Sequence, residues 1–122
     1  MCADLAYMGS PLIATEEANA EHAYKQMIVD SGSPEIVYSD YFTGVHGNYL
    51  RPSIAATGLD ADKLPAAADM DFGSMTEGGK NAWSDVWGAG QGIDAIRKIQ
   101  PAASFIEQLK AEYQAAVSAF RS

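Results

Sequence analysis

The sequence is poor in cysteine, and this limits the redox and metal chemistry it can support. Cys2 is the single cysteine among 122 residues, and the two histidines are His22 and His46. One cysteine cannot form an intramolecular disulfide, and no Cys/His cluster has the spacing of metal ligands. We therefore expect no metal site, and we expect a reducing compartment, the cytoplasm, as the location of the protein.

Positive charge is scarce as well. The chain has 8 Lys and Arg residues against 16 Asp and Glu residues, which gives a formal net charge of -8. Binding to nucleic acid or to an anionic membrane depends on clustered cations, so we expect neither as a partner. The sequence also lacks an apolar run of the roughly 20 residues that span a bilayer, and its first residues lack the basic segment of a secretory signal. These absences favour a soluble protein that is not exported.

Apolar residues make up 48% of the chain, which is enough for one modest domain. The sequence predicts an α/β protein that is mostly helical and has one to three short strands. We expect strands at 3–8 and 35–42 and helices at 20–30, 52–57, 80–87 and 101–120. We also expect a long connection over 59–79, and a helical face marked by Ile93, Ile96 and Ile99.

Particular residues set these boundaries. Asn19 is the expected N-cap of the helix at 20–30, and Gly58 is the expected residue after the end of the helix at 52–57. The last helix has the clearest apolar stripe, formed by Phe105, Ile106, Leu109, Tyr113, Val117 and Phe120. A strand that begins at residue 3 needs neighbours to pair with. We therefore expect the chain to be incomplete as a functional unit.

The tripeptide Met8-Gly9-Ser10 ends the first predicted strand. A glycine permits close approach of a ligand, and backbone N–H groups together with a hydroxyl can bind phosphate. In (β/α)8 barrels, the loops after the last two strands often form such a site. By spacing alone, a simple turn after a strand is favoured over a phosphate site.

Several segments, in order along the chain, resemble those of the nitronate monooxygenase family, formerly called 2-nitropropane dioxygenases. The first match is similar to the family's segment at barrel strand eight, and the others follow through to a Trp-x-Ala-Gly-Gln turn. The matching segments are Ala3-Asp4-Leu5-Ala6-Tyr7-Met8-Gly9-Ser10 with Ile13-Ala14-Thr15-Glu16-Glu17-Ala18, then Tyr24-Lys25-Gln26, Phe42-Thr43-Gly44-Val45-His46-Gly47-Asn48-Tyr49-Leu50, and Trp87-Gly88-Ala89-Gly90-Gln91-Gly92.

The resemblance implies the C-terminal part of an FMN-binding TIM (β/α)8 barrel that oxidises alkyl nitronates with molecular oxygen. It implies that residues 1–14 are the last barrel strand and the flavin-phosphate loop, and that residues 15–122 form a mainly helical region that covers the flavin pocket. The implied FMN-binding residues are Tyr7, Met8, Gly9 and Ser10, and the implied pocket-lining residues are Ala89, Gly90, Gln91 and His46.

Two departures from the family pattern affect this interpretation. Pro11-Leu12 stands where the family usually has Arg-Phe, which removes a cation beside the phosphate. The first seven barrel strands have no counterpart, and the family's catalytic histidine lies within that missing part. We therefore assign no catalytic residue to this chain and expect it to be inactive alone. His46 lies in a Gly-flanked loop without an Asp, Ser or Cys placed to pair with it, so a role in the loop or at the pocket rim is favoured over general-base catalysis.

Two alternatives stay open. An FMN-dependent enoyl-acyl-carrier-protein reductase relative would share the barrel, a similar phosphate loop and a similar Ala-Gly-Gln turn. A truncated, non-catalytic helical module would instead self-associate through the exposed barrel edge and the stripe of Phe105, Leu109, Tyr113 and Val117.

Overall fold

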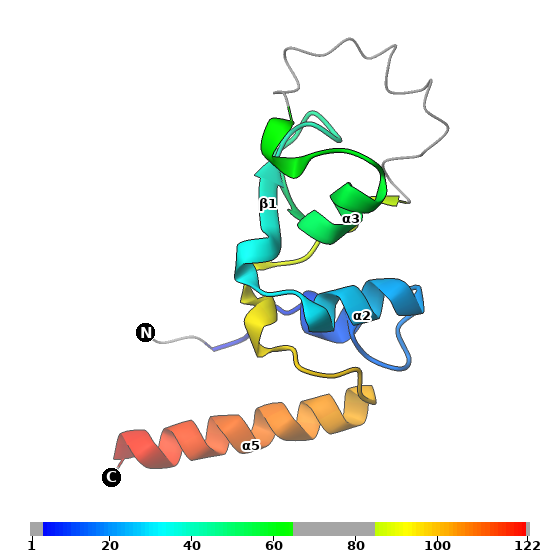
Figure 1. Ribbon diagram of the computed structural model, residues 1–122. Coiled ribbons are helices and arrows are strands. Elements are labelled where there is room, and N and C mark those ends of the chain that lie inside the picture. The colour runs from blue at the N-terminus through cyan, green and yellow to red at the C-terminus, as the bar shows by residue number, and fades with distance from the viewer. Residues whose placement is uncertain (1–3, 65–84, 122) are drawn as a thin grey trace.

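The structure is a computed structural model that describes residues 4–64 and 85–121 (Figure 1). As predicted, the described chain is mostly helical and has two short strands. The elements in chain order are α1 (Ser10–Ile13), α2 (His22–Asp30), the 3-10 turn η1 (Ser33–Glu35), β1 (Ile36–Ser39), β2 (Gly47–Leu50), α3 (Arg51–Ala56), the 3-10 turns η2 (Ala61–Lys63) and η4 (Gln91–Ala95), and α5 (Ala102–Arg121).

The two strands form an antiparallel hairpin. Ile36 pairs with Leu50 and Ser39 pairs with Gly47, so the register runs without interruption across all four positions. The predicted strand at 35–42 is confirmed over 36–39, whereas residues predicted to be loop at 47 and 48 belong to the second strand. A further backbone bridge joins Tyr49 to Gly88, which adds the segment around residue 88 to the free edge of β2.

The predicted strand at 3–8 is not formed, because residues 4–9 have no regular secondary structure. The side chains of Leu5 and Tyr7 are 91% and 105% exposed. A strand is held by hydrogen bonds to its neighbours, and no described segment pairs with these residues. The assignment of residues 1–14 to a last barrel strand and phosphate loop therefore stays a prediction about a longer polypeptide.

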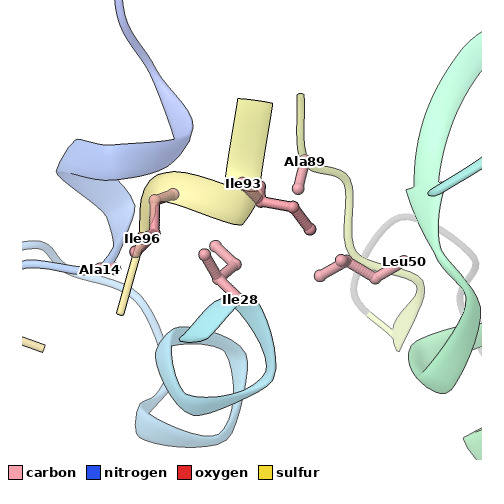
Figure 2. Packing of buried hydrophobic residues seen from close by; sticks show 6 residues of the cluster. All are labelled: Ala14, Ile28, Leu50, Ala89, Ile93 and Ile96. Carbon is pink, nitrogen blue, oxygen red and sulfur yellow. The ribbon is translucent and has the colours of Figure 1, made fainter. Parts of the chain in front are cut away.

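The main core lies where α2, the end of β2 and η4 meet. Figure 2 shows Ile28 of α2, Leu50 of β2 and Ile93 of η4 directed toward one another, and all three are fully buried. Ala14, Ala89 and Ile96 complete the cluster. Tyr24 and Met27 pack against this cluster beside Ile28, so these residues form the inner face of α2. A second, smaller cluster is formed by Phe42, Ile54 and Val86.

Several predicted helix boundaries change. The N-cap of α2 is Glu21 rather than Asn19, and it makes no side-chain capping hydrogen bond. The short helix α3 ends as predicted, since Gly58 has a φ of 88° and donates its N–H to the carbonyl of Ala55 at 2.9 Å. The predicted helical face of Ile93, Ile96 and Ile99 is not formed: Ile93 lies in the short 3-10 turn η4, Ile96 directly follows it, and Ile99 is half-buried. Residues 65–79 of the predicted connection and 80–84 of the predicted helix lie outside the described residues.

The last helix, α5, is confirmed almost at its predicted limits and runs along one side of the molecule (Figure 1). Its N-terminus is fixed by Glu17, whose side chain accepts the N–H of Ala102 at 2.8 Å. Its apolar stripe is largely uncovered, because Phe105 is buried while Tyr113 and Phe120 are 71% and 92% exposed. No helix within the described ranges is long and apolar enough to cross a membrane.

Candidate functional site

The structure brings together two segments that are far apart in the sequence, Met8-Gly9-Ser10 and Ala89-Gly90-Gln91. The N–H of Gly90 donates to Oγ of Ser10 at 2.8 Å, which links α1 to the turn that precedes η4. An alanine Cβ at position 90 would lie 3.5 Å from Ser10 Oγ, so the two backbones approach closely at this point. Gly9-Ser10 and Ala89-Gly90-Gln91 therefore belong to one surface, although 80 positions separate the two bonded residues.

The Met8-Gly9-Ser10 loop is open to a ligand. Gly9 is exposed, and a Cβ built on it would meet no atom within 4 Å. Within the described chain, no acceptor takes the N–H groups of Gly9 or Ser10. Ser10 Oγ accepts a bond from Gly90 and keeps its own O–H to donate. Two amides and one hydroxyl are thus available to an incoming anion.

These donors fit the phosphate of FMN in kind and in accessibility. The helix α1 has only four residues, so its dipole adds little and the binding must come from the individual donors. Pro11 occupies the first turn and offers neither an N–H nor a charge. The loop therefore offers neutral donors alone.

A set of contacts fixes the backbone just before the Ala89-Gly90-Gln91 turn. The carbonyl of Trp87 accepts the N–H of Leu50 at 2.8 Å, and the N–H of Trp87 donates to the buried Oγ of Ser53 at 3.0 Å. The ring of Tyr24 stacks on Trp87 at a centroid distance of 5.0 Å and an interplanar angle of 3°. The hydroxyl of Tyr24 also donates to the carbonyl of Gly88. This part of the chain is held from α2, β2 and α3 at once.

The turn itself has a buried and an open side. Ala89 is 8% exposed and belongs to the main core, whereas Gly90 and Gln91 are exposed. Within the described residues the Gln91 side chain makes no hydrogen bond, so its amide remains available to a ligand. The position of Gln91 is therefore set by its backbone and by the anchor at Ala89.

His46 lies apart from this surface. It sits in the connection between β1 and β2, at the end of the hairpin remote from Leu50 and the main core. Its ring is exposed and stacks on Tyr38 at a centroid distance of 4.7 Å. The structure does not bring His46 together with Ser10 and Gly90. Nearby, the buried Oδ1 of Asn48 has no hydrogen-bond partner in the part of the chain that is described.

The positioning roles of Tyr24 and Ser53 were not found from the sequence. Nothing in the local sequence around Tyr24 indicates that its hydroxyl reaches the carbonyl of Gly88. Ser53 follows a proline in a short helix, and no spacing signal marks its contact with Trp87, which is 34 positions away. Trp87 is half-buried and packs on the main core, whereas Cys2 and Trp83 lie outside the described residues.

Comparisons with known proteins support the fold. No protein-family model and no curated protein matches the chain. The structure is similar to a solved structure of a FabK point mutant from Thermotoga maritima, with a TM-score of 0.65 and 23% sequence identity. The similarity covers 93% of this chain but 35% of the FabK chain. The chain therefore shares the fold of about a third of that protein.

Proposed function

We propose that this chain is the C-terminal part of an FMN-dependent oxidoreductase, and that the complete enzyme oxidises alkyl nitronates with molecular oxygen to a carbonyl compound and nitrite. The hydrogen bond between Gly90 and Ser10 is the observation that most supports this proposal, because it unites the phosphate loop and the Ala-Gly-Gln turn that the resemblance assigns to one flavin pocket. The likeness in fold to FabK agrees with a fragment of such a barrel.

The chain would contribute one wall of the flavin site. Gly9 and Ser10 would bind the phosphate through N–H and O–H groups, with Tyr7 and Met8 beside them. The exposed amide of Gln91 would face the pocket from the adjacent turn. Tyr24, Ser53 and Trp87 would keep that turn in place against Ser10. Bound FMN would supply the electron-transfer chemistry, and this chain would supply binding and orientation.

The main alternative is an FMN-dependent enoyl-acyl-carrier-protein reductase, the class of the FabK neighbour. A likeness of 23% identity supports a common fold and does not favour either substrate. Nitronate oxidation is preferred because residues 42–50 resemble the post-barrel loop of the monooxygenases.

The test begins with the DNA upstream of the codon for Met1, where an open frame should continue into the missing strands. The complete gene product should then purify yellow, release FMN on denaturation, and consume oxygen and form nitrite with propyl-2-nitronate. Oxidation of NAD(P)H by an enoyl thioester without nitrite formation would favour the reductase. A colourless product that does not retain added FMN would refute both flavoenzyme assignments.

A non-catalytic helical module is favoured by one observation, the uncovered stripe of α5, where Tyr113 and Phe120 are 71% and 92% exposed. In this alternative, two copies would bury their stripes against each other. Light scattering after size-exclusion chromatography separates the alternatives. A stable dimer that does not bind FMN would support the module, and a monomer that binds FMN would exclude it.

A further inference from the structure

A cleft of about 600 Å³ lies beside α1, between the segment that follows η4 and the first turns of α5. Pro11, Ile96 and Phe105 supply apolar parts of its lining, and Arg97 and Lys98 supply two adjacent positive charges. Pro11 directly follows Ser10 of the phosphate loop. The cleft therefore begins next to the neutral donors described above and contains the cations that the loop itself lacks.

Arg97 and Lys98 belong to the segment 90–100, and hydrogen bonds at both ends of this segment hold it beside residues 10–16. At one end, Gly90 donates its N–H to Ser10 Oγ at 2.8 Å. At the other end, Glu16 donates its N–H to the carbonyl of Gln100 at 3.0 Å, next to a parallel bridge between Thr15 and Gln100. Residues 90–100 thus run alongside residues 10–16 in the same direction. Arg97 and Lys98 lie within this fixed stretch, on the same cleft as Pro11.

Within the described residues, Arg97 and Lys98 form no ion pair, although the charge of Arg97 contributes to the lowered pKa of the Asp94 carboxyl. The nearby carboxylate of Asp94 accepts the N–H of Ser33 at 2.8 Å. Glu112, which also lines the cleft, accepts a hydrogen bond from the Gln108 side chain at 2.8 Å. In a chain of net charge -8, two adjacent cations that form no ion pair with any described residue mark a place where an anion can bind.

We propose that Arg97 and Lys98 form the cationic side of the flavin-phosphate site, opposite the N–H and O–H donors of Gly9 and Ser10. This inference rests on the proposed function. A phosphate monoester has a charge of about -1.5 to -2 at neutral pH, and hydrogen bonds from charged donors to it are about twice as strong as neutral ones. Arg97 can bind two phosphate oxygens through its planar guanidinium, and Lys98 adds a second charge.

The experiment compares the affinities of the full 122-residue chain for FMN and riboflavin, which differ only by the phosphate. The isotope-labelled chain is titrated with FMN, riboflavin and inorganic phosphate, and amide shifts are followed by NMR. The test variant carries Arg97→Gln and Lys98→Gln. The matched control carries Lys110→Gln and Arg121→Gln, which change the net charge equally on α5 outside the cleft.

In the unchanged chain, FMN and inorganic phosphate should shift the amides of Gly9, Ser10, Arg97 and Lys98, whereas riboflavin should affect them much less. The test variant should lose about tenfold or more in FMN affinity, which corresponds to one charge-assisted contact, with riboflavin binding unchanged. The control should bind FMN like the unchanged chain. Amide spectra without ligand verify that both variants are folded.

The possible failures point to different errors. If FMN shifts Gly9 and Ser10 but the test variant binds it as tightly as the unchanged chain, the loop binds phosphate without these cations. The inference is then wrong and the proposed function stands. If the control loses as much affinity as the test variant, the effect is one of overall charge and the inference is again wrong. If neither FMN nor phosphate shifts Gly9 or Ser10, the proposed phosphate loop fails and the inference fails with it.

Discussion

Gly88 directly precedes the Ala89-Gly90-Gln91 turn, and its backbone lies against β2. An alanine Cβ at this position would be 3.0 Å from the carbonyl oxygen of Asn48, which is closer than ordinary van der Waals contact. The obstacle is backbone, and Asn48 is held in register with Tyr38 on the neighbouring strand. Gly88→Ala should therefore push residues 88–90 away from the hairpin, since no flexible side chain can give way.

The magnitude follows from two opposing effects. Overpacking of a well-fitted site costs about 1–3 kcal/mol. Replacing glycine by alanine also restricts the unfolded chain, which stabilises the folded state by about 0.4–1 kcal/mol. The net loss in the free energy of unfolding should be about 1–2 kcal/mol. Gly92→Ala provides the matched control, because a Cβ there meets no atom within 4 Å and the backbone is not left-handed. It should be neutral or slightly stabilising.

Urea unfolding followed by circular dichroism measures both variants, and the amide shift of Gly90 reports whether its bond to Ser10 survives. We expect Gly88→Ala to unfold at lower urea and to shift the Gly90 amide, with Gly92→Ala unchanged in both measurements. Equal stabilities for the two variants would show that β2 and the segment at 88 do not approach as closely as described. A destabilised Gly88→Ala with an unmoved Gly90 amide would contradict the proposed link from the hairpin to the site.

Three further predictions concern the groups that hold the site in place. Ser53→Ala removes the buried hydroxyl that accepts the Trp87 N–H and should cost about 1–3 kcal/mol, measured by urea unfolding. A loss below about 0.5 kcal/mol would contradict the 3.0 Å bond. Burial raises the pKa of Tyr24, so the stability that Tyr24 contributes is complete below the unfolded value of 10.0 and falls as the pH rises through the folded pKa. Tyr24→Phe should flatten this alkaline loss in stability, and an unchanged pH profile would refute the prediction. The hydrogen bonds from Ser33 lower the pKa of Asp94 below 3.8, so the stability that Asp94 contributes is present above that value and is lost as the pH falls through the folded pKa. Asp94→Asn should make the free energy of unfolding less sensitive to acid, and an equally steep loss of stability at low pH would contradict the contact.

Local patterns in the sequence predicted the elements that depend on local interactions. The helix at 22–30 and the helix at 102–121 follow from apolar residues at helical spacing, and the end of α3 follows from Gly58. The strand at 36–39 follows from β-branched and aromatic residues, but its partner at 47–50 was not predicted. Two glycines and two polar residues in the segment 44–48 resemble a loop, and pairing with β1 overrides that weak local preference.

Long-range interactions explain where the predictions failed. The apolar residues before Gly9 predicted a strand, but a strand forms only with neighbours, and the described chain supplies none there. The stripe of α5 predicted burial, but most of α5 has no described element to pack on, so Tyr113 stays 71% exposed. In both cases the residue pattern indicates a surface to be covered, and the described residues do not cover it.

The candidate site shows the same division between local and long-range information. Spacing alone left Met8-Gly9-Ser10 as a turn or a phosphate loop, and the family resemblance added Ala89-Gly90-Gln91 without saying how the two segments meet. The Gly90 to Ser10 bond gives that contact a physical basis, and the parallel course of residues 90–100 beside α1 then brings Arg97 and Lys98 to the same cleft as Pro11. The sequence indicated that a cation was missing after Ser10. The proposal that Arg97 and Lys98 take its place rests on the three-dimensional arrangement, which brings them to one cleft with Pro11.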